Sequence, residues 1–139
     1  MKKLFLALTL VAVFAGASFA GVQDFGKFTI DVAEGWTAEQ DGETVGIVKN
    51  DNSASMSISV DSTDGASIKE IADEFVKALN GRNLTFADGA YQFDMTNANG
   101  VDSKAILSGD DKNYALFVIT GAENAPDEIS KMLDSVVEK

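Results

Sequence analysis

Residues Tyr114–Thr120 read YALFVIT, in which six of the seven positions are apolar. A strand here would present apolar side chains on both sides, because successive side chains of a strand point to opposite faces. Such continuous apolar runs are typical of strands that are buried on both faces. We therefore predict that residues 114–120 form a central strand of a sheet that has a hydrophobic core on either side.

Two amphipathic segments can cover those two faces. The first opens with a capping box, in which Ser67 and Glu70 each bond the other's backbone amide, and it ends at Asn80-Gly81. The second has Pro126 in its first turn and runs to the C-terminus. Their apolar stripes follow the helical period: Ile68, Ile71, Ala72, Phe75, Val76 and Leu79 in the first, and Ile129, Met132, Leu133, Val136 and Val137 in the second.

The remaining strands alternate apolar and polar residues and are joined by short polar turns, which favours hairpins. Gly35 interrupts the first of them, and we expect it to adopt a backbone angle that other residues resist. The predicted fold is α+β, a mostly antiparallel six- to seven-stranded sheet sandwiched between two helices (αβα). The other predicted strands cover residues 28–32, 44–49, 54–61, 84–96 with a break at Asp88-Gly89, and 101–108.

The segment Phe28–Trp36 (FTIDVAEGW) resembles the opening strand and Pro-Glu-Gly-Trp turn of PsbP-like and DcrB-like domains, with Ala33 in place of the proline. The strand end Ile119–Gly121 and the closing helix Met132–Val136 are also similar. The resemblance covers residues 25–139 and implies a sheet between helices. DcrB-like proteins are cell-envelope proteins, often lipid-anchored, whereas this chain lacks the anchoring cysteine. The resemblance implies a non-enzymatic envelope protein, with no catalytic residues to carry over.

The first twenty residues have the layout of a cleaved secretory signal. Lys2 and Lys3 precede an apolar run from Leu4 to Ala15, and small residues stand before Gly21. The run is shorter than the roughly 20 residues that span a bilayer. We predict cleavage between Ala20 and Gly21, a single domain over residues 21–139, and a periplasmic or secreted protein without stable membrane insertion.

The charge of the predicted mature chain excludes several partners. Lys2 and Lys3 leave with the signal while all 22 acids remain, so nine bases face 22 acids and the net charge is −13. Such a chain repels phosphate backbones, and no basic cluster offsets this repulsion. Nucleic acid and anionic lipid headgroups are therefore not expected partners.

The missing residue types exclude most catalytic chemistry. The chain has no His and no Cys. A Ser-His-Asp triad, a thiol nucleophile and the usual zinc sites therefore cannot be built. Neither a Gly-x-Ser-x-Gly elbow nor a phosphate-binding glycine loop occurs. We predict no enzyme activity, no catalytic residue, no cofactor and no metal ligand, although catalysis by carboxylates alone stays open in principle.

Three aromatic residues are the candidates for a binding surface. Trp36, the only tryptophan, could cap a groove for a ligand or could cover the open end of its own core. Tyr91 and Tyr114 could line a binding surface or could lie on a sheet face with the hydroxyl in water. The sequence leaves both alternatives open for each residue.

Two acidic turns could bind calcium or could be structural. Asp61–Gly65 follows a strand, and Asp110-Asp111 lies at a hairpin tip. An EF-hand needs acids at positions 1, 3 and 5, Gly at 6 and Glu at 12, but here Gly is at 5 and Ala72 is at 12. We expect Asx-type turns at both places and calcium binding at about millimolar strength or weaker.

The most direct hypothesis is a non-enzymatic extracytoplasmic domain that binds a protein partner or assists an envelope complex. The alternative is a small-ligand or divalent-cation binding protein that uses the acidic loops, and a weak carboxylate hydrolase is the third. An exposed apolar surface would favour the first, and a concave pocket with convergent polar groups would favour the second. A carboxylate pair with separated pKa values would favour the third.

Overall fold

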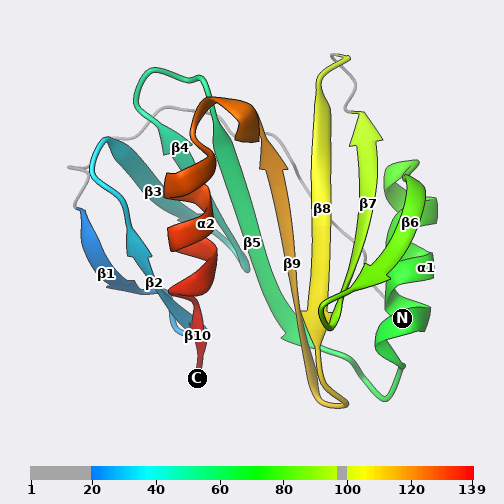
Figure 1. The fold of residues 1–139 in the computed structure, drawn as a ribbon. Helices are drawn as coiled ribbons and strands as arrows, with labels where there is room; N and C mark the ends of the chain where they lie inside the picture. The colour runs from blue at the N-terminus through cyan, green and yellow to red at the C-terminus, as the bar shows by residue number, and fades with distance from the viewer. Residues whose placement is uncertain (1–19, 97–99) are drawn as a thin grey trace.

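A computed structural model describes residues 20–96 and 100–139, which form ten strands, two α-helices and one short 3₁₀ helix (Figure 1). In chain order these are β1 (Gly21–Asp24), β2 (Phe28–Val32), β3 (Trp36–Asp41), β4 (Thr44–Lys49), β5 (Ser55–Ser62), α1 (Ile68–Leu79), β6 (Arg82–Ala87), β7 (Ala90–Thr96), β8 (Asp102–Gly109), β9 (Asn113–Thr120), η1 (Ala122–Asn124), α2 (Pro126–Asp134) and β10 (Val137–Glu138).

The strands form two sheets. The larger has seven strands in the order β3-β4-β5-β9-β8-β7-β6, and the smaller has the order β1-β2-β10. Every strand pairing in both sheets is antiparallel. The predicted α+β class with a mostly antiparallel sheet is therefore confirmed.

Strand β9 lies in the middle of the larger sheet and has a core on each face, as its sequence predicts. Its residues Tyr114–Ile119 are all buried. Alternate residues enter two clusters, since Ala115, Phe117 and Ile119 face one side of the sheet and Tyr114, Leu116 and Val118 face the other.

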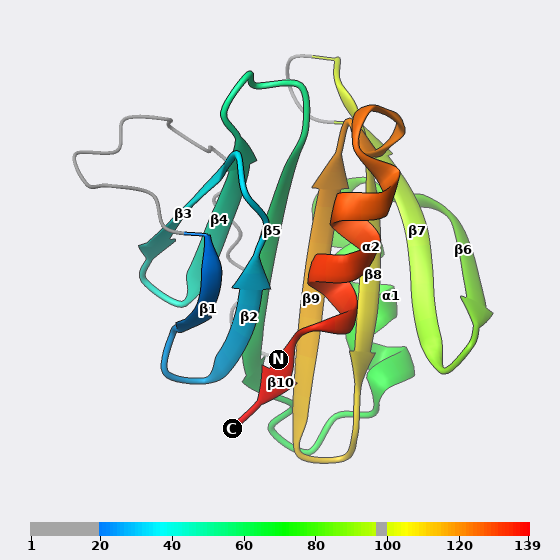
Figure 2. The same ribbon diagram turned by 60° about the vertical axis from the view of Figure 1, so that its left-hand side comes forward.

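A different set of helices and strands packs over each of the two clusters. The α1-side cluster joins α1 to β7, β8 and β9, and its buried members are Ile71, Ala72, Phe75, Phe93, Met95, Ala105, Leu107, Tyr114, Leu116 and Val118. The α2-side cluster joins α2 and β2 to β3, β4, β5 and β9, and its buried members are Phe28, Ile30, Val32, Trp36, Val45, Ile47, Ala54, Met56, Ile58, Val60, Ala115, Phe117, Ile119, Ala125, Ile129 and Met132. Figures 1 and 2 show α2 and the smaller sheet in front of the larger sheet, with α1 behind it.

Helix α1 begins and ends where the sequence predicts. The Ser67 hydroxyl accepts from the Glu70 amide at 3.1 Å, and the Glu70 carboxylate accepts from the Ser67 amide at 3.0 Å. Asn80 ends the helix in the left-handed conformation, at φ 57°. The predicted capping box and the predicted apolar stripe are both confirmed.

The predicted strand 28–32 has the right bounds, but its assignment to the main sheet is wrong. It is β2, which pairs with β1 and β10, two strands that the sequence pattern did not indicate. Strand β3 was also missed, because only Ala38 interrupts its polar residues after Trp36. Gly35 has φ 84°, in the left-handed region, as expected for the turn between β2 and β3.

The predicted continuation of the second helix to the C-terminus is also wrong. Helix α2 ends at Asp134, and Val137 belongs to β10 and is exposed. The Ser135 hydroxyl donates to the Met132 carbonyl at 2.7 Å and accepts from the Asp31 amide at 2.9 Å. These bonds draw the chain away from the helix axis toward β2.

The predicted signal segment, residues 1–20, falls almost entirely outside the described residues, which begin at Ala20. Strand β1 begins at Gly21, the first residue after the predicted cleavage point. Within the described residues, no helix is long and apolar enough to cross a membrane.

Candidate functional site

Four connections converge at one end of the larger sheet, which we call the loop end. They are the β1–β2 turn at residues 25–27, the β3–β4 turn at 42–43, the β5–α1 connection at 63–67 and the β8–β9 turn at 110–112. Antiparallel pairing places them together, because Ser62 at the end of β5 lies opposite Asn113 at the start of β9.

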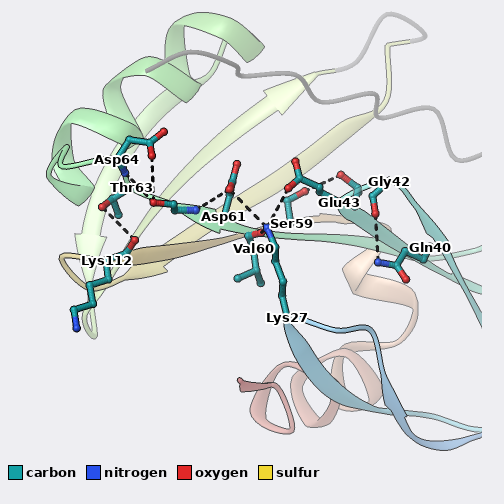
Figure 3. A network of polar contacts seen from close by, with 12 residues as sticks. Lys27, Gln40, Gly42, Glu43, Ser59, Val60, Asp61, Thr63, Asp64 and Lys112 are labelled. Carbon is teal, nitrogen blue, oxygen red and sulfur yellow. Dashed lines mark hydrogen bonds and ion pairs between the residues drawn. The ribbon is translucent and has the colours of Figure 1, made fainter.

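Lys27 links the smaller sheet to the larger one at the loop end (Figure 3). Its ammonium nitrogen lies 3.0 Å from a Glu43 carboxylate oxygen and 3.7 Å from an Asp61 carboxylate oxygen. It also donates to the Val60 carbonyl at 3.3 Å. The Lys27 side chain is half exposed, so solvent screens these ion pairs and their contribution to stability is small.

A cavity of about 190 Å³ opens beside Lys27. The Gln40 side-chain amide stands at its edge and donates to the carbonyls of Phe25 and Gly42, both at 3.3 Å. The volume is below the roughly 300–1,000 Å³ of ordinary small-molecule pockets. The cavity is lined by Phe25, Lys27, Phe28, Gln40, Gly42, Glu43 and Val60.

The first acidic turn is built as a structural connection. The Asp61 carboxylate accepts from the Ser62 amide at 2.8 Å, and the Ser62 hydroxyl accepts from the Asp64 amide at 3.1 Å. Thr63 is buried, and its hydroxyl donates to the Asp111 carbonyl at 2.8 Å, which ties the turn to the β8–β9 hairpin. The Asp61 carboxylate and the Ser62 hydroxyl therefore both hold the backbone of the turn, and the bond to Ser62 is the serine counterpart of the expected Asx-type turn.

The second acidic turn is a hairpin tip. The Asp110 carboxylate accepts from the amides of Lys112 and Asn113, at 2.8 and 2.9 Å. The bond from the Asn113 amide is the main reason that the pKa of Asp110 is lowered. Within residues 20–96 and 100–139, no group of three or more acidic side chains is placed to hold a metal ion.

The structure places Trp36 in the core. Its side chain is fully buried in the α2-side cluster, and its indole nitrogen donates to the Glu128 carboxylate of α2 at 3.1 Å. Trp36 therefore offers no surface to a ligand in this conformation.

The two tyrosines lie on the other face, and the structure does not bring them together with Trp36. Tyr91 of β7 is half-buried, and its ring centroid lies 4.7 Å from that of Phe86, which is exposed. Tyr114 of β9 is only 4% exposed, and its ring makes a T-shaped contact with the ring of Phe75 in α1, with centroids 5.8 Å apart.

Tyr114 is nevertheless next to the loop end. It lies directly opposite Asp61 in the pairing of β5 with β9. Burial, followed by the negative charges of Asp61, Glu43, Asp64 and Glu74, raises the pKa of Tyr114 to about 12.

The carboxyl groups whose pKa departs from its ordinary value do not have the shift that a general acid needs. Catalysis by a carboxyl pair requires one pKa to be raised so that the group keeps its proton near neutral pH. Four described carboxyls instead have a lowered pKa because of hydrogen bonds: Asp24 from Lys139, Asp51 from Ser53, Glu70 from Ser67 and Asp110 from Asn113. They are ionised near neutral pH.

Sequence reasoning missed the group formed by Lys27, Glu43 and Asp61. The first two are 16 positions apart, and each comes from a different hairpin or strand end. Only the acidity of the turns was visible in the sequence. Lys27 lies at this place because β2 belongs to the smaller sheet, and the alternation of apolar and polar residues in β2 did not predict that separate sheet.

Solved structures share this fold. The solution structure of cyanobacterial PsbP (CyanoP) from Synechocystis sp. PCC 6803 matches with a TM-score of 0.56 and 12% identity, over 93% of this chain and 99% of that chain. A crystal structure from Bacteroides thetaiotaomicron VPI-5482 matches with a TM-score of 0.54 and 12% identity, over 81% of this chain. The match covers 45% of the Bacteroides chain, so the two proteins are similar over less than half of its length.

No family model and no curated protein sequence matches this chain. The likeness therefore concerns the fold, which is PsbP-like, and the predicted resemblance to PsbP-like domains is confirmed at that level. The resemblance to DcrB-like domains stays a prediction.

Proposed function

We propose that this protein is a non-enzymatic, extracytoplasmic domain that binds a protein partner through its loop end, in support of an envelope complex. In this proposal the helices α1 and α2 and the sheet between them are an αβα scaffold that holds the loops in place. The observation that carries the proposal is the cavity at the loop end, which has the size of one side chain rather than of a metabolite.

The chemistry of the cavity supports this proposal. Phe25, Phe28 and Val60 supply apolar walls, while Lys27 and Glu43 supply charge at the rim. An apolar floor with a polar rim is the usual composition of the centre of a protein interface. A side chain of a partner could enter this space while neighbouring groups pair with the rim.

Binding can be tested by filling the cavity. Gln40 is exposed on the edge strand β3, so Gln40→Trp should place an indole over the cavity mouth without disturbing the core. Tagged protein would be used to capture partners from an envelope extract of the producing cells. We expect a specific partner with the unsubstituted protein and at least roughly tenfold less of it with Gln40→Trp, since ten-fold corresponds to about 1.4 kcal/mol.

A matched control is Thr85→Trp, which adds the same ring at an exposed position of the other edge strand, β6. It should leave capture unchanged. Absence of any specific partner, or equal capture by both tryptophan variants, would reject the loop end as the binding surface.

Export is tested separately by mass. Strand β1 begins at Gly21, so removal of residues 1–20 takes away no described strand or helix. The intact mass of protein from the extracytoplasmic fraction should correspond to a chain that begins at Gly21. A full-length mass in that fraction would contradict the signal-peptide prediction.

Calcium calorimetry decides the alternative, a divalent-cation binding protein. In each acidic turn one carboxylate, Asp61 or Asp110, accepts backbone amides, which leaves few oxygens for a cation that needs six to eight. We expect dissociation constants of about millimolar or weaker. A stoichiometric micromolar site that is lost in Asp61→Asn or Asp64→Asn would move the cation-binding function ahead of partner binding.

A further inference from the structure

Strand β6 is an open edge of the larger sheet. It stands last in the strand order, and among residues 20–96 and 100–139 only β7 pairs with it. Figure 2 shows it as the outermost strand of the sheet. An open edge presents backbone amides and carbonyls that can pair with a strand of another chain.

The hairpin turn decides which backbone groups of β6 face outward. Asp88 and Gly89 both have positive φ, 53° and 81°, as in a type I′ turn. A turn of this type closes on a hydrogen-bonded pair, here Ala87 with Ala90. Bonded and non-bonded pairs alternate along an antiparallel ladder. The amide and carbonyl of Phe86, one position before Ala87, therefore point away from β7.

The same alternation turns the backbone of Leu84 outward, because it lies two positions before Phe86. The register with β7 shifts between Arg82 and Thr85, and Asn83 at this shift has φ 60°. The free edge of β6 therefore centres on the segment from Leu84 to Phe86.

The side chains of this segment are apolar on one face. Phe86 is 60% exposed, and its ring centroid lies 4.7 Å from that of Tyr91, directly across the hairpin. Tyr91 and Leu84 are partly buried against the α1-side cluster. Phe86 therefore extends the apolar surface of that cluster to the open edge of the sheet.

Charge distinguishes β6 from the other outer strands. The strands at the ends of the two sheets are β1, β3, β6 and β10. Strand β1 carries Asp24, β3 carries Glu39 and Asp41, and β10 carries Glu138, whereas the single charged residue of β6 is Arg82. Two copies of a chain with a net charge of −11 repel each other. Among these four strands, β6 is the one along which a second copy meets no acidic side chain of the strand itself.

The sequence of this edge is complementary to itself. If two copies of β6 lie antiparallel with Thr85 opposite Thr85, then Leu84 of each copy lies opposite Phe86 of the other. The outward backbone groups of these residues can then form two bonded pairs, each of which exchanges two hydrogen bonds. In the same register Arg82 lies opposite Asp88. Apolar pairs and pairs of opposite charge both stabilise antiparallel strands.

We propose that two copies of this chain associate through their β6 strands, antiparallel about Thr85, and so join two seven-stranded sheets into one. Strands β6 and β3 are opposite edges of the larger sheet. The cavity beside Gln40 of β3 therefore stays open in the pair, and the association does not depend on partner binding at the loop end.

The first test is sedimentation equilibrium of the purified exported protein at about 0.15 M salt. We expect a monomer–dimer equilibrium with a dissociation constant of about 100 μM, since such an edge contact buries less than the roughly 1,200 Å² of a standard interface. Phe86→Lys puts a charge on the edge and removes the apolar pair, so it should weaken the dimer at least tenfold. Its far-ultraviolet circular dichroism should be unchanged, because Phe86 is exposed.

The matched control is Val22→Lys on the outer strand β1. Val22 is also an exposed apolar residue, 73% exposed, and the substitution changes the net charge by the same amount. It should leave the dissociation constant within about twofold. A protein that stays monomeric up to about 1 mM, or equal weakening by both lysine substitutions, would overturn the proposal.

The second test checks the register by cross-linking and leaves Phe86 unaltered. The chain has no cysteine, so each single substitution introduces the only thiol. In Thr85→Cys the two thiols of a pair lie directly opposite, with Cβ atoms about 4.5–5.5 Å apart, close to the spacing that a disulfide needs. In Ala87→Cys, at an exposed position on the same face, they lie four positions apart, about 13 Å.

Under mild oxidation with copper-phenanthroline and oxygen, Thr85→Cys should form the covalent dimer at least tenfold faster than Ala87→Cys. Equal rates would show random collisions rather than the register about Thr85 and would overturn the proposal. This test also stands by itself if Phe86→Lys does not fold.

Discussion

The two hydrophobic clusters of this protein are assembled from the chain in opposite ways. The α1-side cluster takes its buried residues from one continuous stretch of the chain, between Ile71 and Val118. The α2-side cluster combines Phe28 near one end of the described chain with Met132 near the other. The α1-side cluster can be predicted from local patterns, whereas the α2-side cluster forms only when segments from both ends of the described chain pack together.

The two clusters share β9, and the difference between them lies in the second layer. On the α1 side, one capped helix supplies the cover. On the α2 side, the helix has no side-chain cap and covers the sheet together with β2. We therefore expect substitutions in the α2-side cluster to be the more costly, because they loosen contacts among more segments at once.

The largest expected effect is Trp36→Ala in the α2-side cluster. Trp36 is fully buried and its indole donates to Glu128, so the substitution opens a cavity and removes a hydrogen bond. We expect the free energy of unfolding to fall by about 4–5 kcal/mol, measured by urea denaturation with circular dichroism. Trp36→Phe, which keeps an aromatic ring but removes the hydrogen-bond donor, should lower the free energy of unfolding far less. A loss below about 2 kcal/mol for Trp36→Ala would show that Trp36 is not a main source of the stability of the α2-side cluster.

Phe75→Ala tests the α1-side cluster in the same assay. Phe75 lies in the middle of the apolar stripe of α1 and touches the ring of Tyr114. We expect a loss of about 3–4 kcal/mol, somewhat less than for Trp36→Ala. A larger loss than that of Trp36→Ala would show that the α1-side cluster is the more sensitive of the two. A neutral result would mean that the packing of α1 does not depend on Phe75.

The cap of α1 should be worth less than either core residue. Ser67→Ala removes the acceptor for the Glu70 amide, and lost caps typically cost about 1 kcal/mol. Ser67→Asp supplies another acceptor and should be close to neutral under the same conditions. If both variants lose the same amount, the capping box is not the source of the stability.

The smallest expected effect is Lys27→Met at the junction of the two sheets. Its ion pairs with Glu43 and Asp61 are half exposed, so a loss of roughly 0.5 kcal/mol is expected. The difference should vanish at about 1 M salt, where the Debye length falls to about 3 Å. Lys131→Met on exposed α2 is the matched control, and a salt-independent loss above about 2 kcal/mol would show that Lys27 holds the smaller sheet in place.

The candidate site was predictable only in part. The sequence predicted Tyr114 as a candidate binding residue, and it predicted acidic turns at Asp61–Asp64 and Asp110-Asp111. It did not predict their gathering with Lys27 and Glu43, because antiparallel pairing joins positions far apart in the chain. Tyr114 and Asp61 are neighbours across two strands that are separated by α1 and three further strands.

Local sequence patterns were enough to predict the features that depend on near neighbours: the α+β class, the capping box of α1, the left-handed Gly35 and the doubly buried strand β9. Each follows from local hydrogen bonding or from the alternation of side chains along one segment. Tertiary structure alone decided that β2 leaves the main sheet, that β3 joins it, and that α2 stops at Asp134 so that Val137 can pair with Thr29. The physical reason is that a short strand or a helix end is marginal on its own, and its state is set by the partner that satisfies its backbone and covers its apolar side.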